Sequence, residues 1–160
     1  MKVFVSHSFK EPLIGMVQYL MRQAEVEPYL AEHDISVRET ISEKILREIK
    51  NSDLFFALLT EPSINSNFVQ QEIGAAVSAK IPILIAVEKG LENEITGFIY
   101  ERDYIVIDRE YTGKAYDDIL LQINNMKSQL ENKKKMKKQK FDGLVATVGI
   151  ICLLALVASD

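Results

Sequence analysis

One glutamate, Glu72, stands out in the stretch NFVQQEIGAA (residues 67–76), which otherwise has the pattern of a core helix. At about 100° per residue, Glu72 falls on the apolar arc of that helix, between Phe68 and Ala76. Burying an ionised carboxylate is costly unless the group is paired or hydrogen-bonded. Two explanations are open: the carboxylate accepts hydrogen bonds from nearby loop amides, or it acts on a ligand.

Other polar side chains that could take part in chemistry lie in predicted loops. They are Ser6, His7, Ser8, His33, Asp34, Asn65 and Ser66. Serine and asparagine are common as turn and helix-cap residues, and histidines in polar loops are commonly solvated. Each of these residues therefore also has a purely structural explanation, and alone none predicts a reaction.

The sequence argues against several familiar kinds of site. No GxGxxG or GxxxxGK[ST] stretch follows the first predicted strand, as a Rossmann fold or a P-loop requires. A phospho-acceptor receiver needs acidic residues where this chain has Ser6, His7, Ser8 and Thr60, and no GxSxG turn occurs. Because the chain has one cysteine, Cys152, and two histidines, we expect no disulfide framework and no metal site.

Five runs rich in β-branched, aromatic and other apolar residues predict the strands that must position these side chains. The runs cover residues 2–6, 26–30, 53–60, 81–88 and 103–108. Strands that alternate with helices across short connections favour a parallel sheet covered on both faces. We expect an α/β fold, a flavodoxin-like three-layer sandwich with strand order 2-1-3-4-5.

Helices are predicted between these strands. They begin near Pro12, at a capping box of Thr40 and Glu43, and at Asn67, and a last one covers Tyr116–Leu130. The second helix is expected to bury Ile41, Ile45, Leu46 and Ile49, whereas EPSINS (61–66) is expected to be a loop, and residues 91–100 a short helix at most. Ligands in such sheets bind beyond the carboxyl ends of strands 1 and 3, at the topological switch point. Glu72 is therefore expected close to that position.

The C-terminal part differs sharply in charge from the rest. Residues 1–131 carry 13 Lys and Arg against 21 Asp and Glu, whereas residues 133–140 (KKKMKKQK) hold six lysines. Residues 143–158 then run without a charge, long enough with their flanks for a short membrane span at 141–159. We expect a domain over residues 1–131, a polybasic linker over 132–140, and a C-terminal transmembrane helix over 141–160.

The lysines beside that span predict its orientation and its partner. Basic residues keep their side of a membrane helix cytoplasmic and attract anionic lipid headgroups. We therefore expect a single-pass tail anchor with the domain in the cytoplasm and with Lys133–Lys140 at the lipid surface. A basic run can also bind nucleic acid, but its place beside an apolar segment argues against that partner.

Two stretches together resemble a known family. KVFVSHSFKE at the start, and the block of Ser66, Phe68, Val69, Glu72, Ile73 and Gly74, resemble the Toll/interleukin-1 receptor (TIR) domain in its bacterial and archaeal form. The resemblance covers roughly residues 1–130. Departures exist, since many such domains have a Trp-Cys pair before the glutamate and Pro-Gly after strand 2, and this chain has neither.

The resemblance implies cleavage of NAD⁺ between nicotinamide and ribose, with Glu72 as the catalytic residue. It implies a pocket that binds NAD⁺ as substrate, with no separate cofactor, and activation by self-association of TIR domains in immune or anti-phage defence. The expected substrate-binding residues are Ser6, Ser8, Phe9, Asp34, Asn65, Ser66 and Phe68. Alternatives are a silent TIR scaffold, a nucleoside-processing enzyme such as a deoxyribosyltransferase, and a cyclase that makes a cyclic ADP-ribose messenger.

Overall fold

The chain divides into two units that are described separately. The computed structural model describes the backbone of residues 1–30 and 41–157, and the side chains of residues 1–30 and 43–139. Its units are Met1–Ile123 and Asn124–Asp160. The predicted pocket residue Asp34 and the capping residue Thr40 lie outside the described residues.

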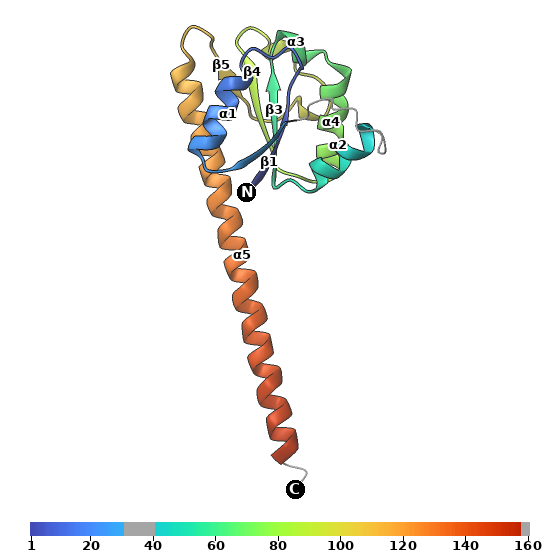
Figure 1. Cartoon of the computed structure of the whole chain (residues 1–160), viewed down its shortest axis with the longest axis vertical. Coiled ribbons are helices and arrows are strands. Elements are labelled where there is room, and N and C mark those ends of the chain that lie inside the picture. The colour runs from blue at the N-terminus through green and yellow to red at the C-terminus, as the bar shows by residue number, and fades with distance from the viewer. Residues whose placement is uncertain (31–40, 158–160) are drawn as a thin grey trace. The chain divides into compact units, whose positions relative to one another are not determined.

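The first unit is built on a parallel sheet (Figure 1). Within the described residues, five strands pair in the order β2-β1-β3-β4-β5, and all four pairings are parallel. They are β1 (Lys2–Ser6), β2 (Glu27–Leu30), β3 (Leu54–Leu59), β4 (Ile83–Glu88) and β5 (Ile105–Ile107). The predicted α/β class and strand order are confirmed, and the strand bounds agree with prediction to within two residues.

Burial explains why the central strands have continuous apolar sequences. Every residue of β3 is buried, because helices cover both faces of the sheet. The β2 strand lies at one edge, where Pro28 is tolerated because an edge strand has fewer ladder hydrogen bonds to make. Aromatic rings of neighbouring strands stack across this part of the sheet, with Phe4 5.4 Å from both Tyr29 and Phe55 between ring centroids.

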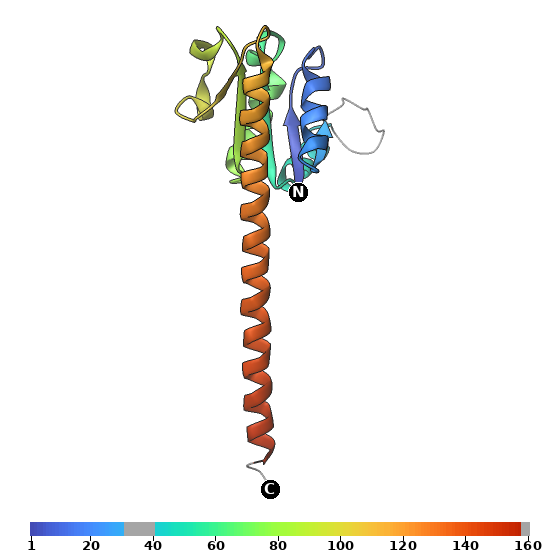
Figure 2. The same cartoon turned by 90° about the vertical axis from the view of Figure 1, so that its left-hand side faces the viewer.

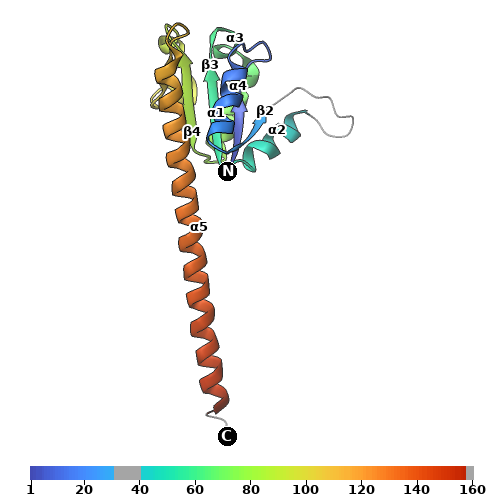
Figure 3. The ribbon, with the colours of Figure 1, turned by 60° about the vertical axis from the view of Figure 1, so that its left-hand side comes forward.

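The helices divide between the two faces of the sheet. Figures 1 and 3 show α1 (Ile14–Gln23) on one side of the sheet and α2 (Ile41–Lys50) and α4 (Asn67–Ser78) on the other. Figure 2 turns the α1 side toward the viewer, with the first turns of α5 (Thr112–Val157) beside α1. On the α4 side, Phe4, Phe55, Ala57, Leu59, Ile85 and Val87 of the sheet form one buried cluster with α4 residues such as Val69, Ile73 and Ala76.

Two local predictions are wrong. Residues Glu61–Ile64, expected in a loop, form the single helical turn α3, because the Ile64 amide donates to the Thr60 carbonyl over 2.8 Å and the Thr60 amide donates to Ser63 Oγ over 2.7 Å. Leu46, expected on the buried face of α2, is 43% exposed. At about 100° per residue it stands at the edge of the arc defined by Ile45 and Ile49.

The stretch between β4 and β5 holds two short 3₁₀ helices, η1 (Glu92–Glu94) and η2 (Gly97–Ile99), where a short helix was expected. The last helix, α5, begins four residues before the predicted start, and its residues Ala115, Ile119 and Ile123 are buried within the first unit.

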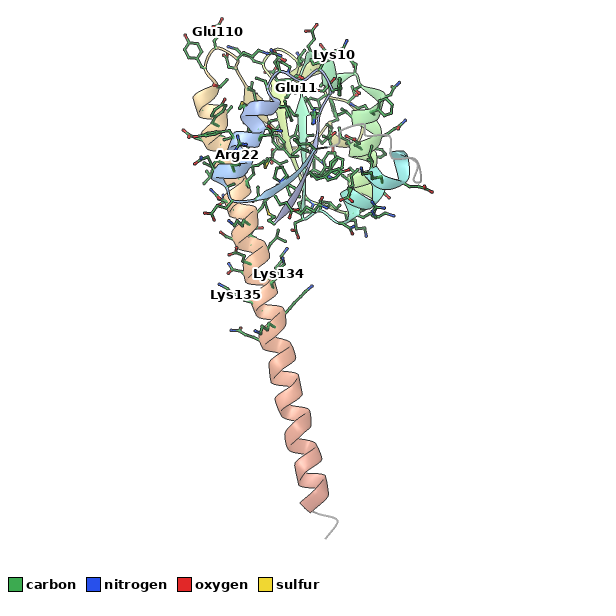
Figure 4. All side chains as sticks on the ribbon, viewed as in Figure 1. Lys10, Glu11, Arg22, Glu110, Lys134 and Lys135 are labelled. Atoms are coloured by element: carbon green, nitrogen blue, oxygen red, sulfur yellow. The ribbon has the colours of Figure 1, made fainter. Side chains whose placement is uncertain are left out.

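The second unit consists of the remainder of α5. Its lysines from Lys133 to Lys138 are exposed, and Figure 4 shows Lys134 and Lys135 pointing out from the helix. Among the described residues, no helix is long and apolar enough to cross a membrane. The predicted span, residues 141–159, falls where side chains are not described, so the anchor stays a prediction.

Candidate functional site

Glu72 lies on the buried face of α4 as the sequence predicts. The residue is 6% exposed, and Val69, Ile73 and Ala76 are buried on the same face of the helix. The Ser6 hydroxyl at the end of β1 donates a hydrogen bond of 2.5 Å to Glu72 Oε2. Because β1 and β3 are neighbours and α4 packs over them, this contact lies at the carboxyl end of the strands, next to the switch point of the sheet.

The environment of Glu72 changes its acidity. Burial raises the pKa of the Glu72 carboxyl from its usual 4.5 to about 7, and the hydrogen bond from Ser6 opposes part of that shift. At neutral pH the group is therefore divided between its acid and its carboxylate form. A carboxyl poised in this way can stabilise a nearby positive charge or exchange a proton, and such groups gather at functional sites.

The loop between β1 and α1 brings a second set of predicted residues to the same end of the sheet. Ser6 is fully buried, His7 and Ser8 are half-buried, and Phe9 is 80% exposed. The ring of His7 hydrogen-bonds the Ser8 carbonyl through Nδ1 over 2.7 Å, and its buried Nε2 has no partner among the described residues. The loop thus presents an aromatic ring to solvent a few residues from the contact between Ser6 and Glu72.

The residues before α4 are less closely connected with Glu72. Ser66 occupies the N-cap position with an extended backbone, and its carbonyl accepts from the Gln70 amide over 3.0 Å. The exposed Asn65 donates from Nδ2 to Glu94 Oε2 over 3.3 Å, which directs its amide toward η1. Phe68, expected beside Glu72 on the apolar arc and among the substrate-binding residues, is 58% exposed. Ser6 is the predicted pocket residue whose hydrogen bond to Glu72 the structure shows.

Sequence reasoning missed a second buried carboxylate, Glu11. It is 5% exposed, and its Oε2 accepts from the Thr60 hydroxyl while its Oε1 accepts from the Leu13 amide over 3.0 Å. In the polar stretch SHSFKE this glutamate looks like a solvated surface charge. A signal was present in Pro12, which marks the start of a helix whose first amides need an acceptor.

A hollow of about 390 Å³ lies next to this carboxylate and is separate from Glu72. It is lined by Lys10, Pro12, Glu61, Pro62 and Arg109. Arg109 is already paired with Glu88 through both its Nε and, over 2.9 Å, its Nη2. Among the described residues, no cluster of His, Cys, Asp or Glu has the arrangement needed to hold a metal ion.

Comparison with known proteins identifies the family. The sequence profile of the TIR domain matches residues 3–120. The chain belongs to the TIR domain family. Among curated proteins, no relative matches the sequence.

Solved structures agree with the TIR fold. The TIR domain of a Toll-related receptor from Hydra magnipapillata has a TM-score of 0.62 at 12% identity, and the match covers 78% of this chain and 97% of that one. A CMP N-glycosidase from Clostridium botulinum has a TM-score of 0.52 at 17% identity, with 78% and 99% covered. A TIR-STING receptor from C. gigas, in complex with 2′,3′-cGAMP, has a TM-score of 0.59 at 16% identity, with 76% and 39% covered. At these identities the likeness shows the fold alone.

Proposed function

We propose that this TIR domain cleaves the bond between nicotinamide and ribose in NAD⁺, with Glu72 as the catalytic residue. The observation that carries the proposal is a buried carboxyl with a pKa raised to about 7, at the carboxyl end of β1 and β3, hydrogen-bonded by the Ser6 hydroxyl. A carboxylate held there without a cationic partner among the described residues is poorly stabilised, so it gains most when a positive charge develops beside it.

The proposed reaction needs only one carboxylate. When the glycosidic bond breaks, its electron pair goes to the ring nitrogen, so nicotinamide leaves as a neutral molecule and no general acid is required. The ribose ring becomes oxocarbenium-like, and the ionised Glu72 stabilises that charge. Water then attacks the anomeric carbon and releases a proton, which yields ADP-ribose. Ribose hydroxyls can donate to the carboxylate beside the bond from Ser6.

The remaining parts of the proposal concern binding and assembly. Ser8 and Phe9 belong to the loop after β1, and Asn65, Ser66 and Phe68 lie at the start of α4. We assign all five to substrate contacts, together with Asp34. The exposed lysines from Lys133 to Lys138 favour anionic lipid, and an adjacent span over residues 141–159 would hold the domain on the cytoplasmic side of a membrane. Confinement to a surface raises the effective concentration of the domains and so favours the self-association that we propose as the trigger in defence.

A second candidate is a nucleotide N-glycosidase that removes another base. The likeness of the fold to a CMP N-glycosidase supports it, because both substrates contain an N-glycosidic bond to ribose. The site described above suits either substrate. The identity of the released base distinguishes them.

The test follows nicotinamide release from NAD⁺ by the full-length chain on anionic vesicles, at low and high surface density. We expect Glu72→Gln and Glu72→Ala to lower the rate by about 100-fold or more, whereas Glu101→Gln, an exposed carboxylate, serves as the matched control. Undiminished release in both Glu72 variants would overturn the catalytic assignment. Cytosine release from CMP would favour the second candidate, a cyclic product would indicate a cyclase, and no release at any density would favour a scaffold.

The membrane anchor has its own test. A chain truncated after Glu131 is expected in the soluble fraction after ultracentrifugation, whereas the full-length chain is expected with the membranes. A truncated chain that stays with the membranes would show that the tail is not the anchor.

A further inference from the structure

The loop between β1 and α1 is attached to the rest of the domain at both of its ends by buried carboxylates. At its start, Ser6 donates to Glu72 on α4 over 2.5 Å. At its end, Glu11 accepts from the Thr60 hydroxyl, where β3 passes into α3. Glu72 and Glu11 are 6% and 5% exposed, so both attachments are shielded from water. Figure 4 shows Glu11 and Lys10 at this end of the sheet.

The two attachments lie on opposite faces of the sheet. Along β1, side chains alternate between faces, so Ser6 points to the same face as Phe4, which packs in the cluster with α4. Along β3, Leu59 belongs to that cluster, and the extended backbone of Thr60 turns its side chain to the other face, where α1 lies. The loop therefore crosses over the carboxyl ends of the strands and is held on each side of them.

The partner of Glu11 is itself held firmly. Thr60 is fully buried, and its backbone amide donates a hydrogen bond to Ser63 Oγ over 2.7 Å. Ser63 is also buried, and its hydroxyl donates to the Leu58 carbonyl over 2.7 Å. Glu11 additionally accepts from the Leu13 amide just before α1. A carboxylate with these donors joins the loop to two rigid elements, β3 and α1.

We propose that Glu11 is a positioning residue, which acts through Thr60 to hold the loop so that Ser6, Ser8 and Phe9 are aligned with Glu72 for substrate. Its role in substrate alignment rests on the proposed function of Glu72. Alignment matters because a displacement of about 1 Å at such groups can lower a rate about 100-fold. The exposed ring of Phe9 most needs this support, since it has little packing of its own.

The contact offers a matched pair of variants at one position. Thr60→Ser keeps the hydroxyl that donates to Glu11, whereas Thr60→Val keeps the shape and removes the donor. Glu11→Gln is a second way to weaken the same contact, because the amide replaces one acceptor with a donor. Glu11→Gln keeps the test decisive if Thr60→Val fails to fold. Circular dichroism shows whether each variant is folded.

The first measurement follows the loop directly and needs no substrate. The chain contains no tryptophan, so Phe9→Trp introduces a single fluorescent reporter at the exposed position. In the full-length chain, we expect its fluorescence anisotropy to fall when Thr60→Val or Glu11→Gln is added and to stay unchanged with Thr60→Ser. Equal anisotropy in all of these chains would overturn the proposal.

The second measurement follows NAD⁺ cleavage in chains that retain Phe9. We expect Thr60→Val and Glu11→Gln to raise KM about tenfold with a smaller change in kcat, because Ser8 and Phe9 bind substrate whereas Glu72 stays in place, and we expect Thr60→Ser to restore the original KM. The acidic limb of the pH profile should not move, since it belongs to Glu72.

An unchanged KM in both variants, with falling anisotropy, would confine Glu11 to a structural role and overturn its part in alignment. If the unaltered chain cleaves no NAD⁺, the proposed function of Glu72 fails, and the anisotropy alone decides whether Glu11 holds the loop.

Discussion

Two buried carboxylates flank the same loop, yet their surroundings differ. Glu11 accepts from the Thr60 hydroxyl and the Leu13 amide, so both of its oxygens are hydrogen-bonded. Glu72 accepts from the Ser6 hydroxyl at Oε2 in the described part of the chain, and burial dominates its pKa. A carboxylate with sufficient donors stabilises the structure around it, whereas one with few donors keeps a tendency to bind a proton or a cation.

That difference assigns the two residues to different tasks. Glu72 has the properties of a group that acts on a ligand, because a charge that is poorly compensated in the resting domain is better compensated when positive charge develops nearby. Glu11 has the properties of a structural residue, because its hydrogen bonds join the loop after β1 to the end of β3 and to the start of α1.

The largest effect is expected on stability at high pH. The pKa of Glu72 is about 7 in the folded domain against 4.5 ordinarily, so rising pH ionises the unfolded chain first and stability falls between these values. Above pH 7 the loss levels off at about 3 kcal/mol. Glu72→Gln removes the titration, and urea denaturation should show a variant more stable by about this amount at pH 8 and similar to the original near pH 4.

The control for that experiment is Glu101→Gln, which removes an exposed carboxylate. Its free energy of unfolding should stay within about 0.5 kcal/mol of that of the original chain, because the substituted side chain is exposed. A Glu72→Gln variant that is less stable than the original at pH 8 would show that Glu72 is well compensated, and the contrast with Glu11 would disappear.

The next effect is on the pH dependence of NAD⁺ cleavage. The reaction requires ionised Glu72, and with a pKa of about 7 the ionised fraction at pH 5 is only about one hundredth. Because this pKa belongs to the free domain, we expect kcat/KM to fall about tenfold per pH unit below 7 and to level off above it. Steady-state rates from pH 5 to 9, with circular dichroism to confirm folding, measure this. A flat profile would contradict the assignment.

A smaller effect is expected when the donor to Glu11 is removed. Thr60→Val leaves a buried carboxylate oxygen without its partner, which costs about 2 kcal/mol of unfolding free energy, whereas Thr60→Ser should cost much less. Urea denaturation at pH 7 compares the two. A valine variant as stable as the serine variant would mean that the hydrogen bond contributes nothing to holding the loop.

The smallest effect is expected at the exposed contact of Asn65 with Glu94. Asn65→Ala should change the free energy of unfolding by no more than about 0.5 kcal/mol, because exposed polar contacts exchange readily with water. If NAD⁺ cleavage nevertheless falls severalfold in this variant, then Asn65 contributes to substrate binding. Unchanged stability and unchanged cleavage would remove it from the pocket.

Much of the fold was predictable because local pattern decides it. The runs VFV (3–5) and LFFALL (54–59) are apolar throughout, which favours burial on both faces, and this in turn favours a parallel sheet between helices. The position of Glu72 on the buried face of its helix was likewise predictable, because helical periodicity puts it on the same face as Val69 and Ala76.

Prediction failed where a side-chain contact decided the outcome. The turn α3 forms because Ser63 and Thr60 exchange hydrogen bonds, and Glu61-Pro62 alone reads as a loop. Phe68, expected on the apolar arc beside Glu72, is largely exposed because its position on the helical wheel lies at the margin of the buried arc.

The amino-acid sequence by itself determined the class of fold, the order of the strands, the helix that carries Glu72 and the charge contrast between residues 1–131 and the lysine run. Periodicity and composition act over a few neighbouring residues, so they can be read directly. Only the tertiary structure decided that Ser6 meets Glu72 and that Glu11 meets Thr60, across 66 and 49 residues of sequence. The burial that raises the pKa of Glu72 depends in the same way on packing between distant elements, because desolvation is a property of the assembled core.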